Sequence, residues 1–414
     1  MAKDKIQRIL ESINLGIGQI LLWGGSYFML SILGQPMMDE THWSHDFIYG
    51  SLSLAMLISG LISPKIGKAI NSQDRNLIMP LSGLIMAIGL AMIALSHYQT
   101  VFILGWIFVG IAMGMGLYDA LFASLGKKYG RNASQSIAQI MLISGFTTTI
   151  IWPFLSLLND QFGWRNTLFI FSAILIVFTI PTHIISFLKS NPTQTNTEKI
   201  ELNTSQTLQE KTTFVPDLKL SFYLLLINFT IGTVLMTGIY VYILEILQHK
   251  GLSINEAITI TAFLGPAQVC IRAVDVLLPK RTPVITAIIS AITIFIAFIL
   301  LLFSPTIAAI GVVLFGLGNG LRSILRGTLP LWIYRPKIYA TMIGKLAVMP
   351  LIAQALTPFF GGLIMQNFGI NALQIILCML AFISIFPMIL LQKVMKGYRI
   401  EYFRKSNRKI SLPF

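Results

Sequence analysis

Six ionisable side chains stand inside long apolar runs of the sequence, where a charge is difficult to accommodate. They are Asp119, Arg272, Asp275, Arg322, Arg326 and Lys345. An ionisable group at the centre of a lipid bilayer costs at least ~2.5–3.5 kcal/mol, so each one is a candidate for function. Cations outnumber acids in this set, which favours an anionic ligand. A guanidinium matches a carboxylate or phosphate in a bidentate manner, whereas a lysine offers a point charge.

Arg322 and Arg326 are the strongest candidate pair for such a ligand. They are four residues apart, so on a helix they share one face. The apolar run around them, residues 306–333, contains no acid that would neutralise them. Asp275, in contrast, lies one helical turn beyond Arg272 and offers that arginine a neutralising partner.

The elements that must position these residues belong in a bilayer. The chain has 414 residues, of which 55% are hydrophobic and only 11% are charged, and its mean hydropathy is +0.76. Soluble domains carry about 25% charged residues, so a soluble enzyme and a disordered chain are excluded. The two cysteines, Cys270 and Cys378, lie in apolar runs, and the five histidines have no metal-ligand spacing. We therefore expect no enzymatic activity, no metal site and no cofactor.

Apolar stretches long enough to span a membrane as helices, which takes ~20 residues each, occur twelve times. They run over 12–34, 46–66, 77–97, 101–125, 133–157, 166–188, 220–247, 255–278, 284–303, 306–333, 339–365 and 370–392. Most of the 30 Lys and Arg residues lie before the first stretch, in alternate connections and after the last stretch. The positive-inside rule then predicts that both termini are cytoplasmic. This placement also accounts for the net charge of +14 without any nucleic-acid partner.

A polar segment divides the chain into two parts. Residues 189–219 are rich in Thr, Asn, Gln and Glu and predict a mobile cytoplasmic linker. An N-terminal half of six stretches, residues 1–188, precedes the linker, and a C-terminal half of six, residues 220–392, follows it. The basic tail 393–414 is expected to lie on an anionic membrane leaflet, where each Lys or Arg is worth ~1 kcal/mol.

An internal repeat supports this division. The glycine pattern of Gly105 to Gly114 is echoed 206 residues later by Gly311 to Gly320, and Phe162-Gly163 is echoed at the same offset by Phe368-Gly369. Two anchors with one offset predict two halves of the same topology.

Short motifs resemble the major facilitator superfamily of transporters. The segment Gly60-Leu-Ile-Ser-Pro-Lys-Ile-Gly67-Lys68 is similar to the family's loop between helices 2 and 3, and Phe162-Gly-Trp-Arg165 to its usual start of helix 6. Stretches similar to a bacterial subgroup are Gly18–Tyr27, Gly116–Ala120, Gly265–Val269 and Asn319–Pro330. The resemblance implies an all-α membrane protein with 12 transmembrane helices in two six-helix pseudo-repeats, and a substrate cavity between the halves near the midplane.

The chain also departs from the family's pattern. Pro64 stands where the loop usually has an aspartate that takes part in gating. Trp106 replaces the helix-4 arginine that is often tied to proton coupling, and Trp152-Pro153 replaces the Gly-Pro motif of many drug antiporters.

The resemblance suggests roles for the charged residues. Carboxylate carriers of the family use an arginine in helix 8, and the oxalate/formate exchanger adds a lysine in helix 11, which correspond to Arg272 and Lys345. Asp119 is expected either to carry the coupling proton or to be a gate partner of Lys65 or Lys68. At ~1.5 Å of rise per residue, these groups lie nearer the cytoplasm than a midplane site requires, so a gate or structural clamp remains the alternative.

Uncharged polar and aromatic residues are further candidates for the wall of this cavity. They are Gln19, Trp23 and Tyr27 at helical spacing, with Trp152, Gln268, Asn319 and Gln354. The alternative for Trp23 and Tyr27 is ordinary helix packing. Close packing is the expected role of Gly110, Gly114 and Gly116.

Together these features predict a secondary active transporter in the bacterial inner membrane, a monomer that works by alternating access. Its expected cargo is a small organic anion or amphipathic metabolite, its expected coupling ion is the proton, and efflux is favoured because no sugar- or peptide-carrier signature occurs. The alternatives are a multidrug exporter and, from a different class, a transporter-like membrane sensor.

Overall fold

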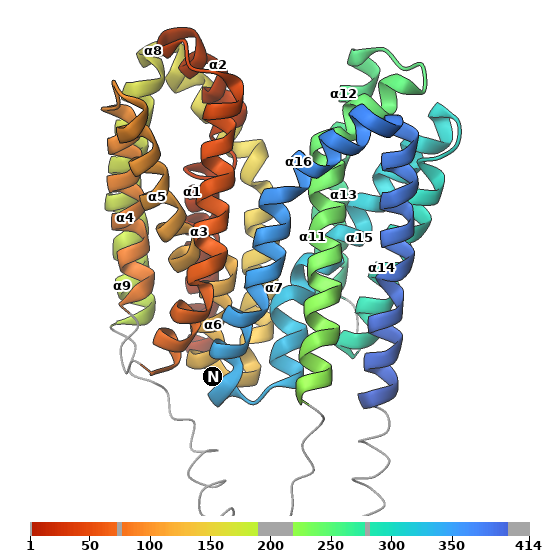
Figure 1. Ribbon diagram of the computed structural model, residues 1–414. Helices are drawn as coiled ribbons and strands as arrows, with labels where there is room; N and C mark the ends of the chain where they lie inside the picture. Colours follow the sequence, from red (N-terminus) through yellow and green to blue (C-terminus); the bar gives the residue numbers. More distant parts are fainter. Residues whose placement is uncertain (1, 73–76, 189–217, 278–281, 396–414) are drawn as a thin grey trace, which may run out of the picture.

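The computed structural model describes residues 2–72, 77–188, 218–277 and 282–395, and within these ranges the chain forms helices and turns but no strand. The predicted linker 189–219 and tail 393–414 lie almost entirely outside the described residues. Figure 1 shows two helix bundles side by side, the earlier residues in red to yellow and the later ones in green to blue. They are called here the N-terminal and the C-terminal half.

Each half consists of helices that are joined by short connections. In the N-terminal half they are α1 (Ala2–Gly24), α2 (Leu30–Thr41), α3 (His45–Ser72), α4 (Ile78–Ala94), α5 (Gln99–Gly116), α6 (Tyr118–Tyr129), η1 (Gly130–Asn132), α7 (Ala133–Ile143), η2 (Ser144–Phe146), α8 (Thr147–Ile174), η3 (Leu175–Thr179) and α9 (Ile180–Phe187). In the C-terminal half they are α11 (Leu218–His249), α12 (Ile254–Ala262), α13 (Leu264–Leu277), α14 (Pro283–Leu300), α15 (Pro305–Ile333) and α16 (Pro336–Ile383). After a turn at Ser384 the last helix continues to residue 395.

Seven helical stretches among the described residues are long and apolar enough to cross a membrane. Two of them, Gln99–Phe187 with 89 residues and Pro336–Met395 with 60, pass through bends. A straight helix of 89 residues would measure about 130 Å, against a hydrocarbon core of about 30 Å, so the longest stretch must cross more than once. The count of 12 stays a prediction, because α1 and α2 are not among the seven and α4 is shorter.

Each of these two long stretches has one bend at a glycine that is equivalent in the repeat. Gly163 has a φ of 74° and Gly369 a φ of 81°. This is the left-handed region, which glycine enters without steric cost. The 206-residue repeat is therefore matched by the same backbone conformation in both halves.

Glycines also set the distance between neighbouring helices, as the sequence predicts. On α5, a Cβ at Gly110 would meet the backbone of Ala55 on α3 at 2.6 Å. On α15, a Cβ at Gly316 would lie 2.9 Å from the carbonyl oxygen of Leu264 on α13. Because neither contact leaves room for a Cβ, the helix backbones touch at equivalent places in both halves.

The predicted first and fourth helices are both interrupted. The first stretch breaks after Gly24, and the second glycine of the pair, Gly25, packs so closely on Phe171 that a Cβ would lie 2.8 Å from its ring. The fourth breaks at Leu117, whose ψ is −175°. A pair of glycines has low helix propensity, and the close approach of α8 stabilises the first break.

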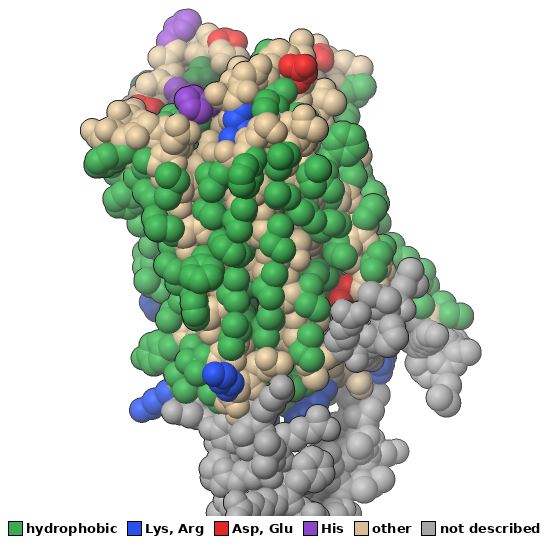
Figure 2. Space-filling model, turned by 90° about the vertical axis from the view of Figure 1, so that its right-hand side faces the viewer, with side chains coloured by type: hydrophobic (Ala, Val, Ile, Leu, Met, Phe, Trp, Pro, Cys, Tyr) green, Lys and Arg blue, Asp and Glu red, His purple; other side chains and the backbone are tan. Residues whose placement is uncertain are grey.

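Charged side chains mark the two ends of the molecule. Figure 2 shows an apolar belt with Lys and Arg below it and mostly acidic and histidine side chains above it. The lower end, called the basic end, carries Lys65, Lys68, Lys127, Lys128 and Lys337. The opposite end, called the far end, carries Asp39, Glu40, His42, His45 and Asp46. This is the pattern of a protein that spans a bilayer.

Candidate functional site

An ion pair joins the two halves near the basic end. Arg326 on α15 donates from Nε and Nη2 to the two carboxylate oxygens of Asp119 on α6, at 2.9 and 2.7 Å. The Arg326 and Asp119 side chains are only 24% and 16% exposed. The predicted pairing of Asp119 with Lys65 or Lys68 is wrong, because both lysines are exposed on α3 and Arg326 occupies the carboxylate.

Two aromatic side chains fill glycine sockets beside this ion pair. Phe122 on α6 lies on Gly327 of α15, where a Cβ would come within 2.7 Å of its ring. Tyr339 on α16 lies on Gly126 of α6, where there is no room for a Cβ. The Tyr339 hydroxyl also donates to the Gly327 carbonyl oxygen at 2.9 Å. In this contact each half thus provides both an aromatic ring and a glycine that makes room for the ring of the other half.

Helices α3 and α16 cross at the same level. A Cβ on Gly344 of α16 would lie 2.5 Å from the carbonyl oxygen of Ser63 on α3, and Gly67 of α3 packs equally close to Ala340 and Gly344. This whole contact between the halves is called the basic-end seal. It consists of Gly67, Asp119, Phe122, Gly126, Arg326, Gly327, Tyr339 and Gly344.

Further from the basic end, polar side chains of both halves meet in a second group. The Tyr27 side chain, in the turn after α1, lies close to Gln354 on α16 and to Tyr240 on α11. Gln268 on α13 donates from Nε2 to the Tyr240 hydroxyl at 2.6 Å. Tyr240 is 44% exposed although Gln268 and Gln354 are buried. With Arg272, these residues form what is called the central cluster.

Arg272 is the only cation of the central cluster, and neutral groups hold it. Its Nε donates to Ser323 Oγ at 3.1 Å, its Nη1 to the Met141 carbonyl oxygen at 2.9 Å, and its Nη2 to Gln268 Oε1 at 3.3 Å. The residue is only 6% exposed. The predicted neutralisation by Asp275 is replaced by these contacts. Because Met141 belongs to α7, the guanidinium also links the two halves.

Aromatic rings line the N-terminal side of the central cluster. The Trp23 ring lies 5.1 Å from Tyr118 and 6.0 Å from Phe28, and Phe28 lies 6.4 Å from Trp152, centroid to centroid. Trp152 is 40% exposed, and the buried indole N–H of Trp23 has no partner. Trp23 therefore packs against neighbouring rings, which was the alternative expected for it, and its role in the cavity wall stays a prediction.

Gln19 serves the backbone rather than the cluster. It is fully buried and donates from Nε2 to the Gly116 carbonyl oxygen at 2.7 Å. The break at Leu117 removes that carbonyl from the regular helix, so Gln19 supplies the hydrogen bond that a buried carbonyl needs.

The predicted pair Arg322 and Arg326 is not brought to one site. Whereas Arg326 reaches across to α6, Arg322 donates from Nε and Nη2 to Asn319 Oδ1 on its own helix, at 3.2 and 2.8 Å. Lys345 is exposed, one turn before the equally exposed Met349 on α16. Arg322 lies close to Tyr240 of the central cluster but makes no hydrogen bond to it. Lys345 belongs neither to the central cluster nor to the basic-end seal.

Two polar contacts near the ends of the molecule have little signal in the sequence. At the basic end, Lys128 Nζ donates to Glu11 at 2.7 Å and to the Ser186 carbonyl oxygen at 2.6 Å, and Tyr129 is hydrogen-bonded to the same carboxylate. The one available signal was the acid directly before the first apolar stretch.

The second contact, at the far end, joins Glu40 to the Phe-Gly-Trp-Arg segment. Arg165 Nε donates to Glu40 at 2.7 Å, and Trp164 Nε1 to its other oxygen at 2.6 Å. The hydrogen bond from Arg165 lowers the pKa of Glu40.

Tyr118 and Tyr240 are two further residues of the site that the sequence does not single out. An isolated tyrosine in an apolar run looks the same whether it packs in the core or lines a site.

Metal chemistry finds no support in the described part of the chain, where no group of three His, Cys, Asp or Glu residues is close enough to hold an ion.

Known proteins match both the sequence and the fold. The sequence model of the Major Facilitator Superfamily matches residues 15–344. Monocarboxylate transporter 14 of Mus musculus is 26% identical over 151 residues, and that of Homo sapiens is 26% identical over 153. Each match covers 36% of this chain and 29% of the relative, so it spans less than a third of the relatives' length.

Three solved structures share the fold over nearly the whole chain. The human organic anion transporter MFSD10 has a TM-score of 0.68 and 16% identity, with 92% of this chain and 99% of that chain covered. The proton:xylose symporter XylE has 0.69 and 13%, covering 94% and 96%. FucP in the outward conformation has 0.69 and 13%, covering 92% and 99%. With the family match, these observations show that the chain belongs to the Major Facilitator Superfamily and is a transporter rather than an enzyme.

Proposed function

We propose that this transporter moves a small organic anion by alternating access of the central cluster to the two sides of the membrane. The observation that carries the proposal is Arg272. Its charge is buried, its hydrogen-bond partners are neutral, and they come from both halves. A buried charge without a counterion is costly, and a carboxylate would offset that cost with two charge-assisted hydrogen bonds.

The contacts of Arg272 also suggest how cargo is linked to movement. Its Nη1 donates to the Met141 carbonyl oxygen across the boundary between the halves. A bound carboxylate competes for this donor, so loading the site weakens one contact between α13 and α7. The names of the similar proteins, a monocarboxylate transporter and an organic anion transporter, agree with an anionic cargo.

The basic-end seal is the gate in this proposal. We place the basic end in the cytoplasm of a bacterial cell, in accord with the positive-inside rule. In the described conformation the seal then closes the cytoplasmic side, and a substrate would reach the central cluster from the far end. The gate opens when Asp119 is protonated, because a neutral carboxyl no longer holds Arg326 as an ion pair. Inward movement of the proton would then drive export of the anion.

Transport by purified protein in liposomes tests the proposal. Labelled mono- and dicarboxylates are offered from each side, with and without a pH gradient. Arg272→Gln is expected to lower anion flux about 10-fold or more, since a lost charged hydrogen bond is worth about 1.5–3 kcal/mol, and Arg272→Lys to retain part of it. The matched control is Arg131→Gln, because Arg131 is exposed at the basic end. Unchanged flux in Arg272→Gln would refute the anion site.

The aromatic wall favours a second candidate, export of flat amphipathic compounds. Trp23, Phe28, Tyr118 and Trp152 present linked rings, and aromatic pairs stack on apolar ligands. Efflux of a fluorescent amphipathic dye tests it. If Trp152→Ala lowers dye efflux while Arg272→Gln leaves it intact, and no carboxylate is transported, the amphipathic cargo is the better assignment.

A further inference from the structure

A second arginine lies at the edge of the central cluster. Helix α13 carries Arg272, and helix α15 carries Arg322. The two helices touch at Gly320, where a Cβ would lie 2.8 Å from the carbonyl oxygen of Gln268. Arg272 Nε donates to Ser323 Oγ at 3.1 Å, and Ser323 directly follows Arg322 in the chain. The packing of α13 on α15 therefore brings two cations of the C-terminal half near each other.

Tyr240 on α11 lies close to both arginines. Its hydroxyl oxygen accepts a hydrogen bond from Gln268 Nε2 at 2.6 Å, and its own O–H donates to no atom within the described ranges of the chain. The residue is 44% exposed, so this proton is available to a ligand. The hydroxyl thus offers one more hydrogen-bond donor beside the two guanidinium groups.

Arg322 is held by a neutral partner on its own helix. Its Nε and Nη2 both donate to Asn319 Oδ1, at 3.2 and 2.8 Å. This edge of a guanidinium is the one that matches the two oxygens of a carboxylate, so a carboxylate is a better partner for it than the single amide oxygen. The Arg322 side chain is partly exposed. An acidic group of a ligand can therefore replace Asn319 as its partner.

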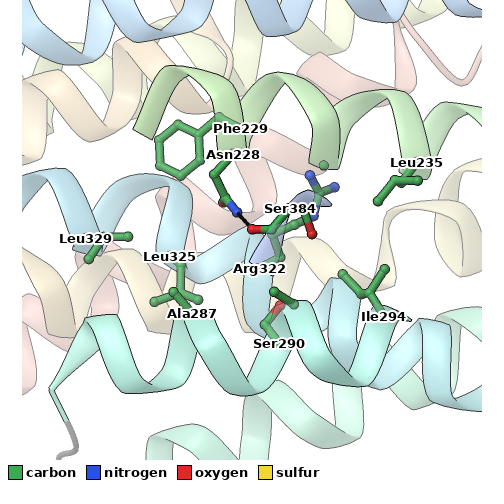
Figure 3. A pocket seen from close by; sticks show the side chains of 12 residues that line it. Asn228, Phe229, Leu235, Ala287, Ser290, Ile294, Arg322, Leu325, Leu329 and Ser384 are labelled. Carbon is green, nitrogen blue, oxygen red and sulfur yellow. Dashed lines mark hydrogen bonds between the residues drawn. The ribbon is translucent and has the colours of Figure 1, made fainter. Parts of the chain in front are cut away.

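The pocket on the other side of Arg322 is too small for such a group. Figure 3 shows the guanidinium beside α11, between Asn228 and Leu235. Its Nη1 packs against Gly232, where there is no room for a Cβ. The free space that remains is about that of one water molecule. A ligand therefore has to meet Arg322 on the side of the central cluster, where Tyr240 is exposed.

We propose that the cargo is a small dicarboxylate, with one carboxylate bound by Arg272, the other by Arg322, and a further hydrogen bond from the Tyr240 hydroxyl. This inference rests on the proposed transport of an anion through the central cluster and narrows its class. A dicarboxylate neutralises both cations, whereas a monocarboxylate leaves Arg322 with its neutral partner. Because an uncompensated charge in such a place is costly, the second carboxylate should add to the affinity.

Transport by the purified full chain in liposomes tests this cargo class. Dicarboxylates of increasing length, from oxalate to adipate, are each compared with their own monoamide, which has nearly the same size but only one charge. We expect the preferred dicarboxylate to exceed its monoamide in kcat/KM by about 10-fold or more, the factor for one charged hydrogen bond. Arg322→Gln should remove this preference by lowering dicarboxylate transport to the rate of the monoamide.

Further variants cover the case that Arg322→Gln does not fold. Asn319→Asp supplies Arg322 with an acidic partner inside the protein and should also abolish the preference, although both arginines remain. Arg322→Lys keeps the charge and should retain part of the preference. Tyr240→Phe removes only the hydroxyl and should lower dicarboxylate transport several-fold. The control Arg131→Gln alters an exposed arginine and should leave the preference unchanged.

The outcomes separate this inference from the proposed function. If the monoamides are transported as well as the dicarboxylates and Arg272→Gln abolishes both, the cargo is a monoanion, so the dicarboxylate assignment is wrong while anion transport stands. If no member of either series is transported, both proposals are wrong. A preference that survives both Arg322→Gln and Asn319→Asp would overturn the role of Arg322.

Discussion

The α5–α6 segment and α15 occupy equivalent places in the 206-residue repeat, yet they end differently. Both contain glycines, Gly105 to Gly114 and Gly311 to Gly320, that pack closely against a neighbouring helix. Beyond that point the N-terminal segment breaks at Leu117 and presents Asp119, whereas α15 runs unbroken to Ile333 and presents Arg322 and Arg326. The repeated glycines therefore account for the helix packing in both halves. The residues that differ between the halves include Asp119 and Arg326, whose opposite charges meet between the halves.

The reason for the difference lies in a few positions. Gly116 stands where α15 has Arg322, 206 residues later, and arginine has a higher helix propensity than glycine. The break also needs a hydrogen-bond donor for the Gly116 carbonyl, which Gln19 provides. The residue at the same offset from Gln19 is Leu225, an apolar side chain. The half with the broken helix thus has the donor that the break needs, and the half with the unbroken helix has an apolar residue in its place.

The largest expected effect breaks the contact between the two segments. Arg326→Gln leaves the Asp119 carboxylate, only 16% exposed, without its ion-pair partner, which costs about 3 kcal/mol. We expect the basic-end seal to open more often, by ~10-fold or more. The measurement is labelling of Ser124→Cys, a buried position, by a maleimide applied from the basic end, in a protein without Cys270 and Cys378.

A charge exchange provides the control for this prediction. The double variant Asp119→Arg with Arg326→Asp restores opposite charges and should bring labelling back towards the original rate. Equal labelling in the unaltered protein and in Arg326→Gln would show that the ion pair does not close the seal.

A socket glycine should have a smaller effect, because the clash is local. Gly327→Val places side-chain atoms against Phe122, and overpacking costs about 1–3 kcal/mol. We expect faster labelling of Ser124→Cys together with a lower Tm. Adding Phe122→Ala makes space and should reverse part of both changes. If the double variant is no better than Gly327→Val alone, the socket does not act as described.

The broken segment should depend on Gln19 in a way that α15 does not. Gln19→Leu removes the donor to the buried Gly116 carbonyl, which costs about 1 kcal/mol and should lower Tm by a few degrees. The control Gln99→Leu alters an exposed glutamine and should leave Tm unchanged. A Tm that is insensitive to Gln19→Leu would mean that the break needs no donor.

The smallest expected effect concerns the segments that follow Gly163 and Gly369. Trp164 and Arg165 bind Glu40, but Ile370 and Asn371 stand at the equivalent positions. Arg165 lowers the pKa of Glu40 below its ordinary value of 4.5. The pair therefore stabilises the fold above about pH 4.5, and this contribution is lost as the pH falls through the lowered pKa.

Glu40→Gln isolates this contribution. The Glu40 side chain is 51% exposed, so the pair is worth only about 0.5 kcal/mol. The variant should lower Tm slightly at pH 7 and match the unaltered protein at a pH below the lowered pKa. A Tm difference that persists without change into acid would contradict the assignment.

Much of the architecture follows from local features of the sequence. Apolar runs predict membrane helices because each residue contributes its own transfer free energy, and the repeat of Gly105 to Gly114 predicts equivalent helix contacts because only small residues allow backbones to touch. The same reasoning identified Asp119, Arg272 and Arg326 as functional candidates, because charge inside an apolar run is costly wherever it finally lies.

The choice of partners was decided by the tertiary structure alone. Asp119 pairs with an arginine 207 residues away rather than with the lysines of α3. Arg322 and Arg326 bind different partners although they are one helical turn apart. Partners depend on where several helices converge and on which neighbours are glycines, such as Gly232 and Gly327. Charge and hydropathy are properties of single residues and can be read in order, but a contact between the halves depends on the packing of the whole chain.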